Sequence, residues 1–225
     1  MGFWEYTILI MIPVMVFAGY AQNKIRSTYQ RYSRVPTRNG LTGYETALRL
    51  LQDEGISGVP IREIPGDLTD HYDPRNRSLG LSRGVYRGQS IAAIGVAAHE
   101  IGHAKQHARG NALLAFRNQF APVAQIGSSL AIPLVFIGYF LGLAGLSQFG
   151  VVLFSAVVIF QLITVPVEKD ASRRALRMLQ SGGYLDATEL AGAKRVLDAA
   201  ALTYIASLVV AVAHLFRLML FTRRS

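Results

Sequence analysis

Residues 97–107 read Ala-Ala-His99-Glu100-Ile-Gly-His103-Ala-Lys-Gln-His107 and contain the pattern His-Glu-x-x-His. On a helix, positions four apart lie one turn apart on the same face, so His99 and His103 can direct their imidazoles at one ion. Glu100 lies beside the first histidine, where its carboxylate can take a proton from a water at the metal. The pattern predicts a zinc hydrolase centre with His99 and His103 as ligands and Glu100 as general base.

A helix with two histidines on a solvated face is the alternative interpretation. The preceding residues 91–98, Ile-Ala-Ala-Ile-Gly-Val-Ala-Ala, are apolar and mostly small, which is typical of a buried helix that other elements approach closely. Burying two imidazoles and a carboxylate costs free energy unless a partner satisfies them, and a metal ion is such a partner. The context therefore favours the zinc interpretation.

The composition is that of a membrane protein. Charged residues make up 16% of the 225-residue chain, against about 25% in a typical soluble domain, and the mean hydropathy is +0.30. The net charge of +9 comes from basic clusters, which are expected at the cytoplasmic ends of membrane helices. No nucleic-acid partner is expected, since no basic stretch interleaved with aromatic residues is present. The absence of cysteine excludes disulfides and thiolate zinc ligands, and it fits a reducing compartment.

The N-terminal apolar segment predicts a membrane anchor. Residues 3–21 are long enough for one span. A signal peptide is the alternative, but basic residues follow this segment at 24–38 instead of preceding it. We therefore expect an uncleaved anchor with its N-terminus outside and residue 24 onward in the cytoplasm.

Two further apolar stretches predict the remaining membrane segments. Residues 121–167 carry no charge, and as one helix they would run about 70 Å, more than twice the hydrocarbon thickness. We expect them to fold back as spans 121–144 and 149–166, with a turn on the outer side. Residues 199–216 form a fourth segment, and the basic tail that follows leaves open whether this helix crosses fully.

Five regions are expected along the chain: an N-terminal transmembrane anchor (1–21), a cytoplasmic zincin half with the His-Glu-x-x-His helix (22–120), a transmembrane hairpin (121–167), cytoplasmic helices that carry the third ligand (168–198), and a C-terminal membrane helix with a basic tail (199–225).

Local signals predict the elements of the polar regions. Thr42 with Glu45, and Asp186 with Glu189, have the spacing of helix capping boxes, and Ser90 is the expected N-cap of the zinc helix. Short strands are expected at 59–64 and 78–82, separated by a polar loop at 68–74. The strand at 78–82, taken as an edge strand, could bind substrate backbone by strand addition.

A third protein ligand is needed, because catalytic zinc usually has three protein ligands and one water. The extended metzincin pattern is excluded, since Gln106 and Arg109 stand where it requires glycine and histidine. His107 lies about 12 Å from His99 along the helix, too far to share the ion. No acidic residue occurs between Glu100 and Glu168, and the predicted hairpin returns Glu168 to the side of the zinc helix. Glu168 is therefore the expected third ligand.

Other polar residues are weaker candidates for the site. Asp170 could orient a ligand histidine or pair with Arg174 four residues on. His71 and Asp73 belong to a loop that would have to fold over the cleft. An oxyanion donor is also expected, and four residues remain equal candidates for it: Arg173, Arg174, Tyr184 and Tyr204.

Four stretches together resemble the YugP-like neutral zinc metallopeptidases of bacterial membranes: AAHEIGHAKQH, LTDHYDP, PVEKDASRRAL and the segment from Leu79 to Ile91. The resemblance covers nearly the whole chain and is more specific than His-Glu-x-x-His alone. It implies a gluzincin-type site, similar in layout to HtpX-like membrane proteases, with His99, His103 and Glu168 as ligands. Lys169 departs from the apolar residue expected there, which leaves the packing around Glu168 open.

These observations predict a mainly α, integral membrane protein with a helical zincin core, a short edge strand or hairpin, and about four membrane helices. The expected function is that of a zinc-dependent endopeptidase with one zinc ion per chain, in which a metal-activated water and Glu100 hydrolyse peptide bonds. The expected place is the inner (plasma) membrane, with the site facing the cytoplasm and with protein or peptide substrates, among them membrane proteins. A non-catalytic membrane adaptor with a structural metal is the alternative.

Overall fold

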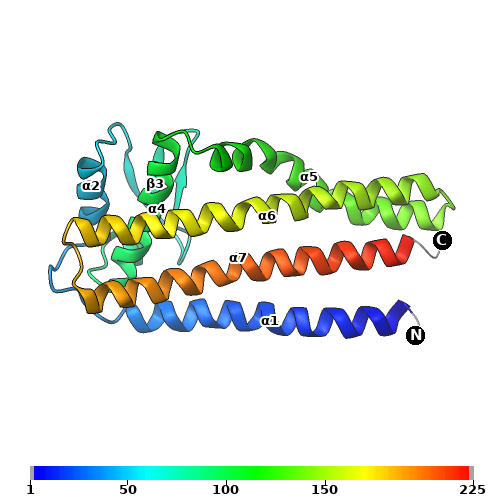
Figure 1. The fold of residues 1–225 in the computed structure, drawn as a ribbon, viewed down its shortest axis with the longest axis horizontal. Helices are drawn as coiled ribbons and strands as arrows, with labels where there is room; N and C mark the ends of the chain where they lie inside the picture. Colours follow the sequence, from blue (N-terminus) through cyan, green and yellow to red (C-terminus); the bar gives the residue numbers. More distant parts are fainter. Residues whose placement is uncertain (1–2, 223–225) are drawn as a thin grey trace. The chain divides into compact units, whose positions relative to one another are not determined.

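The computed structural model describes residues 3–222, and the expected basic tail at 223–225 lies outside them. The described chain is mainly helical with one small sheet, as predicted (Figure 1). It divides into two compact units. The membrane unit comprises Met1–Gln22, Ala115–Pro166 and Thr203–Ser225, and the polar unit comprises Asn23–Leu114 and Val167–Leu202.

Four long helices supply the membrane unit, and among the described residues these four are long and apolar enough to cross a membrane. They are α1 (Phe3–Tyr32), α5 (Ala112–Phe140), α6 (Ala144–Ser181) and α7 (Ala187–Thr222). The expected spans are therefore present, but α1, α6 and α7 each continue beyond their apolar segment into the polar unit. In particular, α6 does not break at Pro166, so its apolar part and Glu168 belong to one helix.

The turn of the hairpin lies earlier than the sequence suggested. It consists of residues 141–143, with Gly142 at φ +66°, and not of residues 145–148, which already belong to α6. Ser147 is buried because its hydroxyl donates to the carbonyl of Val135 at 3.0 Å. Gly138 permits this close approach, since a side chain there would collide with Ser147. This hydrogen bond satisfies the hydroxyl of Ser147, which the sequence placed in the turn and which is instead buried in α6.

The polar unit contains a three-stranded sheet in the order β1-β3-β2, formed by β1 (Ile61–Ile64), β2 (His71–Asp73) and β3 (Ser78–Ser82). β3 pairs in parallel with β1 and antiparallel with β2. The interpretation of 78–82 as an edge strand was therefore wrong: both of its edges are paired, and Leu79 and Leu81 are fully buried. The error arose because residues 71–73, which form β2, were expected to belong to a loop on account of the turn-forming residues around them.

The helices of the polar unit begin where the capping signals placed them. Helix α2 (Gly43–Asp53) begins with the Thr42–Glu45 capping box, and α7 begins after Asp186, whose carboxylate accepts from the backbone of Glu189. A short helix, α3 (Arg83–Tyr86), precedes α4 (Ile91–Ala108), and Ser90 caps α4 through the backbone N–H of Ala93 at 3.2 Å.

Helix α4 is buried in the core of the polar unit, as its small apolar residues predicted. Ile94 and Ile101 are fully buried among side chains of α2, the sheet, and the polar-unit parts of α6 and α7. Gly102 permits the closest approach, because a Cβ atom there would lie 2.5 Å from the carbonyl oxygen of Ala171 on α6. The small residue therefore allows the backbone of α6 to run directly against the middle of α4.

Candidate metal centre

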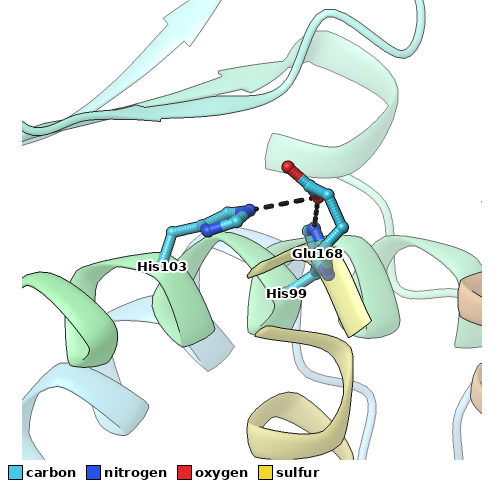
Figure 2. A group of neighbouring side chains, drawn as sticks. All are labelled: His99, His103 and Glu168. Atoms are coloured by element: carbon cyan, nitrogen blue, oxygen red, sulfur yellow. Dashed lines mark hydrogen bonds and ion pairs between the residues drawn. The ribbon is translucent and has the colours of Figure 1, made fainter. Parts of the chain in front are cut away.

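Two histidines of α4 and one glutamate of α6 meet at this contact. His99 and His103 lie one turn apart, and Figure 2 shows both rings directed at the carboxylate of Glu168. One potential ligand atom from each residue lies within 4.8 Å of the other two. The three side chains are only 11%, 10% and 3% exposed, respectively. The structure thus brings together the three residues that the sequence singled out as metal ligands.

The spacing between the carboxylate oxygen and each imidazole nitrogen fits a tetrahedral zinc ion. The Oε2 atom of Glu168 lies 3.2 Å from Nε2 of His99 and 3.4 Å from Nε2 of His103. Two ligands about 2.0–2.1 Å from one ion at tetrahedral angles are separated by about 3.3–3.4 Å. Two imidazole nitrogens and one carboxylate oxygen are also the donor types that zinc accepts. In geometry and chemistry, the residues fit the ion.

The second nitrogen of each imidazole has its own partner. Nδ1 of His99 lies 3.1 Å from the hydroxyl of Ser172, and Nδ1 of His103 lies 3.0 Å from Oε1 of Gln106. An amide oxygen only accepts hydrogen bonds, so Nδ1 of His103 donates to Gln106, and Nε2 is the ring nitrogen that faces Glu168. Such partners hold each ring in the orientation that a metal ligand needs.

Gln106 also connects His103, a candidate ligand, to Asp170. Its amide nitrogen donates to the carbonyl oxygen of Val167 and to Oδ2 of Asp170, both at 2.9 Å, which fixes the orientation of the amide. Asp170 accepts in addition from Nε of Arg174 at 2.6 Å. The two expectations for Asp170 thus meet in one chain of contacts: it pairs with Arg174, and it reaches the histidine through Gln106.

Burial and the carboxylate of Glu168 shift the pKa of His103 in opposite directions. Burial by itself lowers the pKa of His103, but the hydrogen bond and negative charge of Glu168 outweigh it, so the pKa of His103 is raised. The charge of Glu100, which is itself buried, acts in the same direction. The negative charges around the two rings would stabilise a cation bound between them.

Asp70 is a half-buried neighbour of Glu100 that sequence reasoning missed. Its carboxylate accepts from the backbone N–H and the hydroxyl of Ser82, at 2.7 Å and 3.1 Å. Burial raises the pKa of Asp70, the bonds from Ser82 partly offset this, and the charge of Glu100 raises it further. Asp70 directly precedes His71 in the loop that the sequence put forward, and it is the residue of that loop whose pKa is raised by the charge of Glu100.

Those loop residues make local contacts instead. His71 is exposed, and its Nδ1 lies 2.9 Å from the carbonyl oxygen of Thr69. Asp73 accepts from the backbone of Arg75 and from the side chain of Asn76, both at 2.9 Å, which is the pattern of a turn. Neither side chain belongs to the group that gathers around Glu168.

The oxyanion candidates are spread over the chain. The hydroxyl of Tyr184 donates to Asp53 at 2.6 Å, and burial together with this bond raises its pKa to about 12. Arg173 is largely exposed and lies 3.6 Å from Asp170, close to Arg174 on the same helix. Tyr204 belongs to the membrane unit. Of the four candidates, the two arginines are thus in contact with a residue linked to the ligands.

Comparisons with known proteins agree with this centre. The model of a family described as "Putative neutral zinc metallopeptidase" matches residues 7–223. The chain is 44% identical over 211 residues to the "Putative membrane protease YugP" of Bacillus subtilis (strain 168), covering 93% of both chains. No solved structure matches it. The family description names the metal that the three buried donors fit, and the chain belongs to this family of neutral zinc metallopeptidases.

Proposed function

We propose that this protein is a membrane-embedded, zinc-dependent endopeptidase with one zinc ion per chain. One observation carries the proposal: two Nε2 atoms and one carboxylate oxygen converge at tetrahedral spacing, while each Nδ1 atom is held by a partner of its own. His99, His103 and Glu168 would hold the ion. Glu168 would also contribute a negative charge to a gluzincin-type site.

The protein's own groups would carry the proton transfers. A bound zinc ion would supply Lewis acidity, polarising a peptide carbonyl and lowering the pKa of water. The carboxylate of Glu100 then takes the proton of the attacking water and delivers it to the nitrogen of the leaving amine. Its burial, 7% exposed, keeps this carboxylate away from bulk water. The side chains of Gln106 and Asp170 hold His103 in the ligating orientation throughout.

The membrane topology supports a site on the cytoplasmic side. The basic cluster at 24–38 belongs to the polar unit, and basic residues flanking a span favour the cytoplasm. The ligands belong to the same unit. We therefore place the site at the inner face of the plasma membrane, where it would act on cytoplasmic or membrane proteins.

An adaptor with a structural metal is the second function to be weighed. Structural zinc sites are usually closed by four protein ligands, whereas the group in the described residues has three. A structural site also needs no carboxylate beside its first ligand. Both features favour the peptidase over the adaptor.

The direct test uses the purified full-length protein in detergent. Zinc content should approach one ion per chain, and casein should be cleaved in a reaction that a chelator stops and added zinc restores. Full zinc occupancy with no cleavage of casein or of membrane-protein substrates would favour the adaptor.

A further inference from the structure

A polar cavity lies in the polar unit at the C-terminal end of α4, the helix that carries His99 and His103. Its volume is about 430 Å³, and α4 forms one wall through Ala104, His107 and Ala108. The polar side chains that matter for its charge come from four elements or turns: Glu54, Tyr72, Arg77, Lys105, His107 and Arg109. None of the three candidate zinc ligands lines it.

The cavity lies within reach of a peptide that is held at the metal. His107 follows His103 by one turn on the same face of α4, a rise of about 6 Å. An extended peptide advances about 3.3 Å per residue. A peptide held at the candidate metal would therefore span the distance from His103 to His107 with about two residues.

The cavity carries an excess of positive charge. Three permanent cations line it against one carboxylate. Glu54 pairs with Lys105, and it also lies 3.6 Å from Arg109. Lys105 and Arg109 lie at the C-terminal end of α4, where the helix dipole alone would favour positive charges. The charges of the helix end therefore have a structural explanation that needs no ligand.

The presence of Arg77 at the cavity is not explained by a helix end or by an ion pair in the described part of the chain. It comes from the turn between β2 and β3, it is exposed, and within the described residues it has no ion-pair partner. Its backbone stands at φ +47°, a conformation that residues with a side chain seldom adopt. A cation is thus held in a costly conformation at a cavity that already contains two others.

Tyr72 and His107 add an oriented donor to the wall. The hydroxyl of Tyr72 lies 2.9 Å from Nδ1 of His107. In the tautomer in which the hydroxyl donates to Nδ1, the other ring nitrogen keeps its proton and can donate to an anion. A cavity lined by a guanidinium group and a ring N–H donor suits a carboxylate.

We propose that this cavity is a substrate subsite that binds a carboxylate group of the peptide, about two residues from the bond that is cut. The proposal rests on the proposed peptidase function. Two sources share this chemistry: the side chain of an aspartate or glutamate, and the C-terminal carboxylate of a short peptide. Either would bind to Arg77 and to the donors beside it.

Cleavage profiling tests the subsite on the zinc-loaded, full-length protein. Random peptide libraries are digested, and the products are identified by mass spectrometry. Aspartate and glutamate should be enriched several-fold at one position near the cleavage sites, and Arg77→Gln should abolish this enrichment, measured relative to neutral residues at the same position in the same digest. Arg75→Gln, which changes an exposed arginine of the same turn that does not line the cavity, is the matched control. Libraries with amidated C-termini distinguish the sources, since they remove preference for a terminal carboxylate only.

A binding measurement separates failure of the subsite from failure of the peptidase. The Glu100→Gln protein is titrated with amidated pentaglutamate and amidated pentaglutamine, each with an uncharged fluorescent label, and anisotropy is recorded. The acidic peptide should bind roughly ten-fold more tightly, as expected for one partly exposed charge-assisted contact. Arg77→Gln should remove this preference and Arg75→Gln should retain it. Free-acid pentaglutamine repeats the test for a terminal carboxylate. Equal affinities of all peptides, or a preference that survives in Arg77→Gln, would overturn the subsite even if the protein cut nothing.

Discussion

Gly102 of α4 lies directly against the backbone of Ala171 on α6, so closely that a Cβ atom on Gly102 would approach the carbonyl oxygen to 2.5 Å. His99 precedes Gly102 by three residues, and Glu168 precedes Ala171 by three. The glycine contact therefore sets the separation of the two helices at the place where the candidate ligands His99 and Glu168 meet. Nothing in the His-Glu-x-x-His spacing itself indicates this role.

Gly102→Ala should weaken metal binding without removing a ligand. Its Cβ would meet backbone atoms, which cannot move aside as a flexible side chain can, so α4 and α6 must separate. We expect zinc affinity to fall roughly ten-fold or more, as measured by chelator competition. Gly145→Ala is the matched control, because nothing lies within 4 Å of the position of its Cβ. Unchanged affinity in Gly102→Ala would show that the helices are not held at this distance by the glycine.

The second prediction concerns Gln106, whose amide oxygen receives the Nδ1 proton of His103. Gln106→Met keeps the approximate volume but removes this acceptor and the donor to Asp170. We expect zinc affinity to fall about 10–100-fold while α4 remains folded, as measured by chelator competition and circular dichroism. Gln106→Glu, which keeps an acceptor for Nδ1, should retain more affinity than Gln106→Met. The reverse order would contradict the orienting role.

The grouping of His99, His103 and Glu168 could be predicted from the sequence because it follows from helix geometry and one long-range step. Two histidines four apart share a face of any helix, and the acid-free interval left Glu168 as the first carboxylate to return. Ser172 could have been found in the same way, since it lies one turn beyond Glu168 on the same face. The position of Gln106 three residues after His103 was likewise within reach of helix periodicity.

The sheet could not be predicted in full, because strand pairing is a non-local property. The parallel pairing of β1 with β3, and the place of β2 outside them, follow from contacts between segments that local patterns do not report. Asp70 illustrates the consequence. The pKa of Asp70 depends on its bonds to Ser82, twelve residues away, and on the charge of Glu100. Its neighbours in the sequence gave no reason to prefer it over His71 or Asp73.

Asp70 leads to a prediction about pH. Its pKa is raised in the folded protein, so the unfolded state ionises first and Asp70 lowers stability as the pH rises. This loss should develop between the ordinary pKa of aspartate, about 3.9, and the raised pKa of Asp70. Asp70→Asn keeps an oxygen acceptor for Ser82 but carries no charge. The difference in melting temperature, variant minus wild type, should therefore increase across this interval and then remain constant. A difference that is independent of pH would show that the Asp70 charge carries no cost.

Topology can be tested by cysteine accessibility, since the chain has no cysteine of its own. Single cysteines at Ser33 and Ser181, both exposed in the polar unit, should resist an impermeant thiol reagent in intact cells and react after permeabilisation. A cysteine at Leu141, in the hairpin turn and 65% exposed, should react in intact cells. Ser147 is unsuitable as the outer position, because it is buried against Val135. Labelling of Ser33 or Ser181 positions from outside would reverse the proposed orientation.

The last prediction separates binding of the metal from chemistry at the metal. Glu100→Gln keeps size and shape but removes the base, and Glu100 is not among the three grouped donors. The variant should therefore fold, insert and bind zinc as the wild type does, while its cleavage of casein falls roughly 10²–10⁴-fold. His99→Ala and Glu168→Ala should instead lose zinc together with activity, because each removes one of three donors. An adaptor would behave differently: the wild type would show no zinc-dependent cleavage, and Glu100→Gln would complement a deletion strain fully. If Glu100→Gln cleaves casein at the wild-type rate with zinc at full occupancy, Glu100 is not the general base.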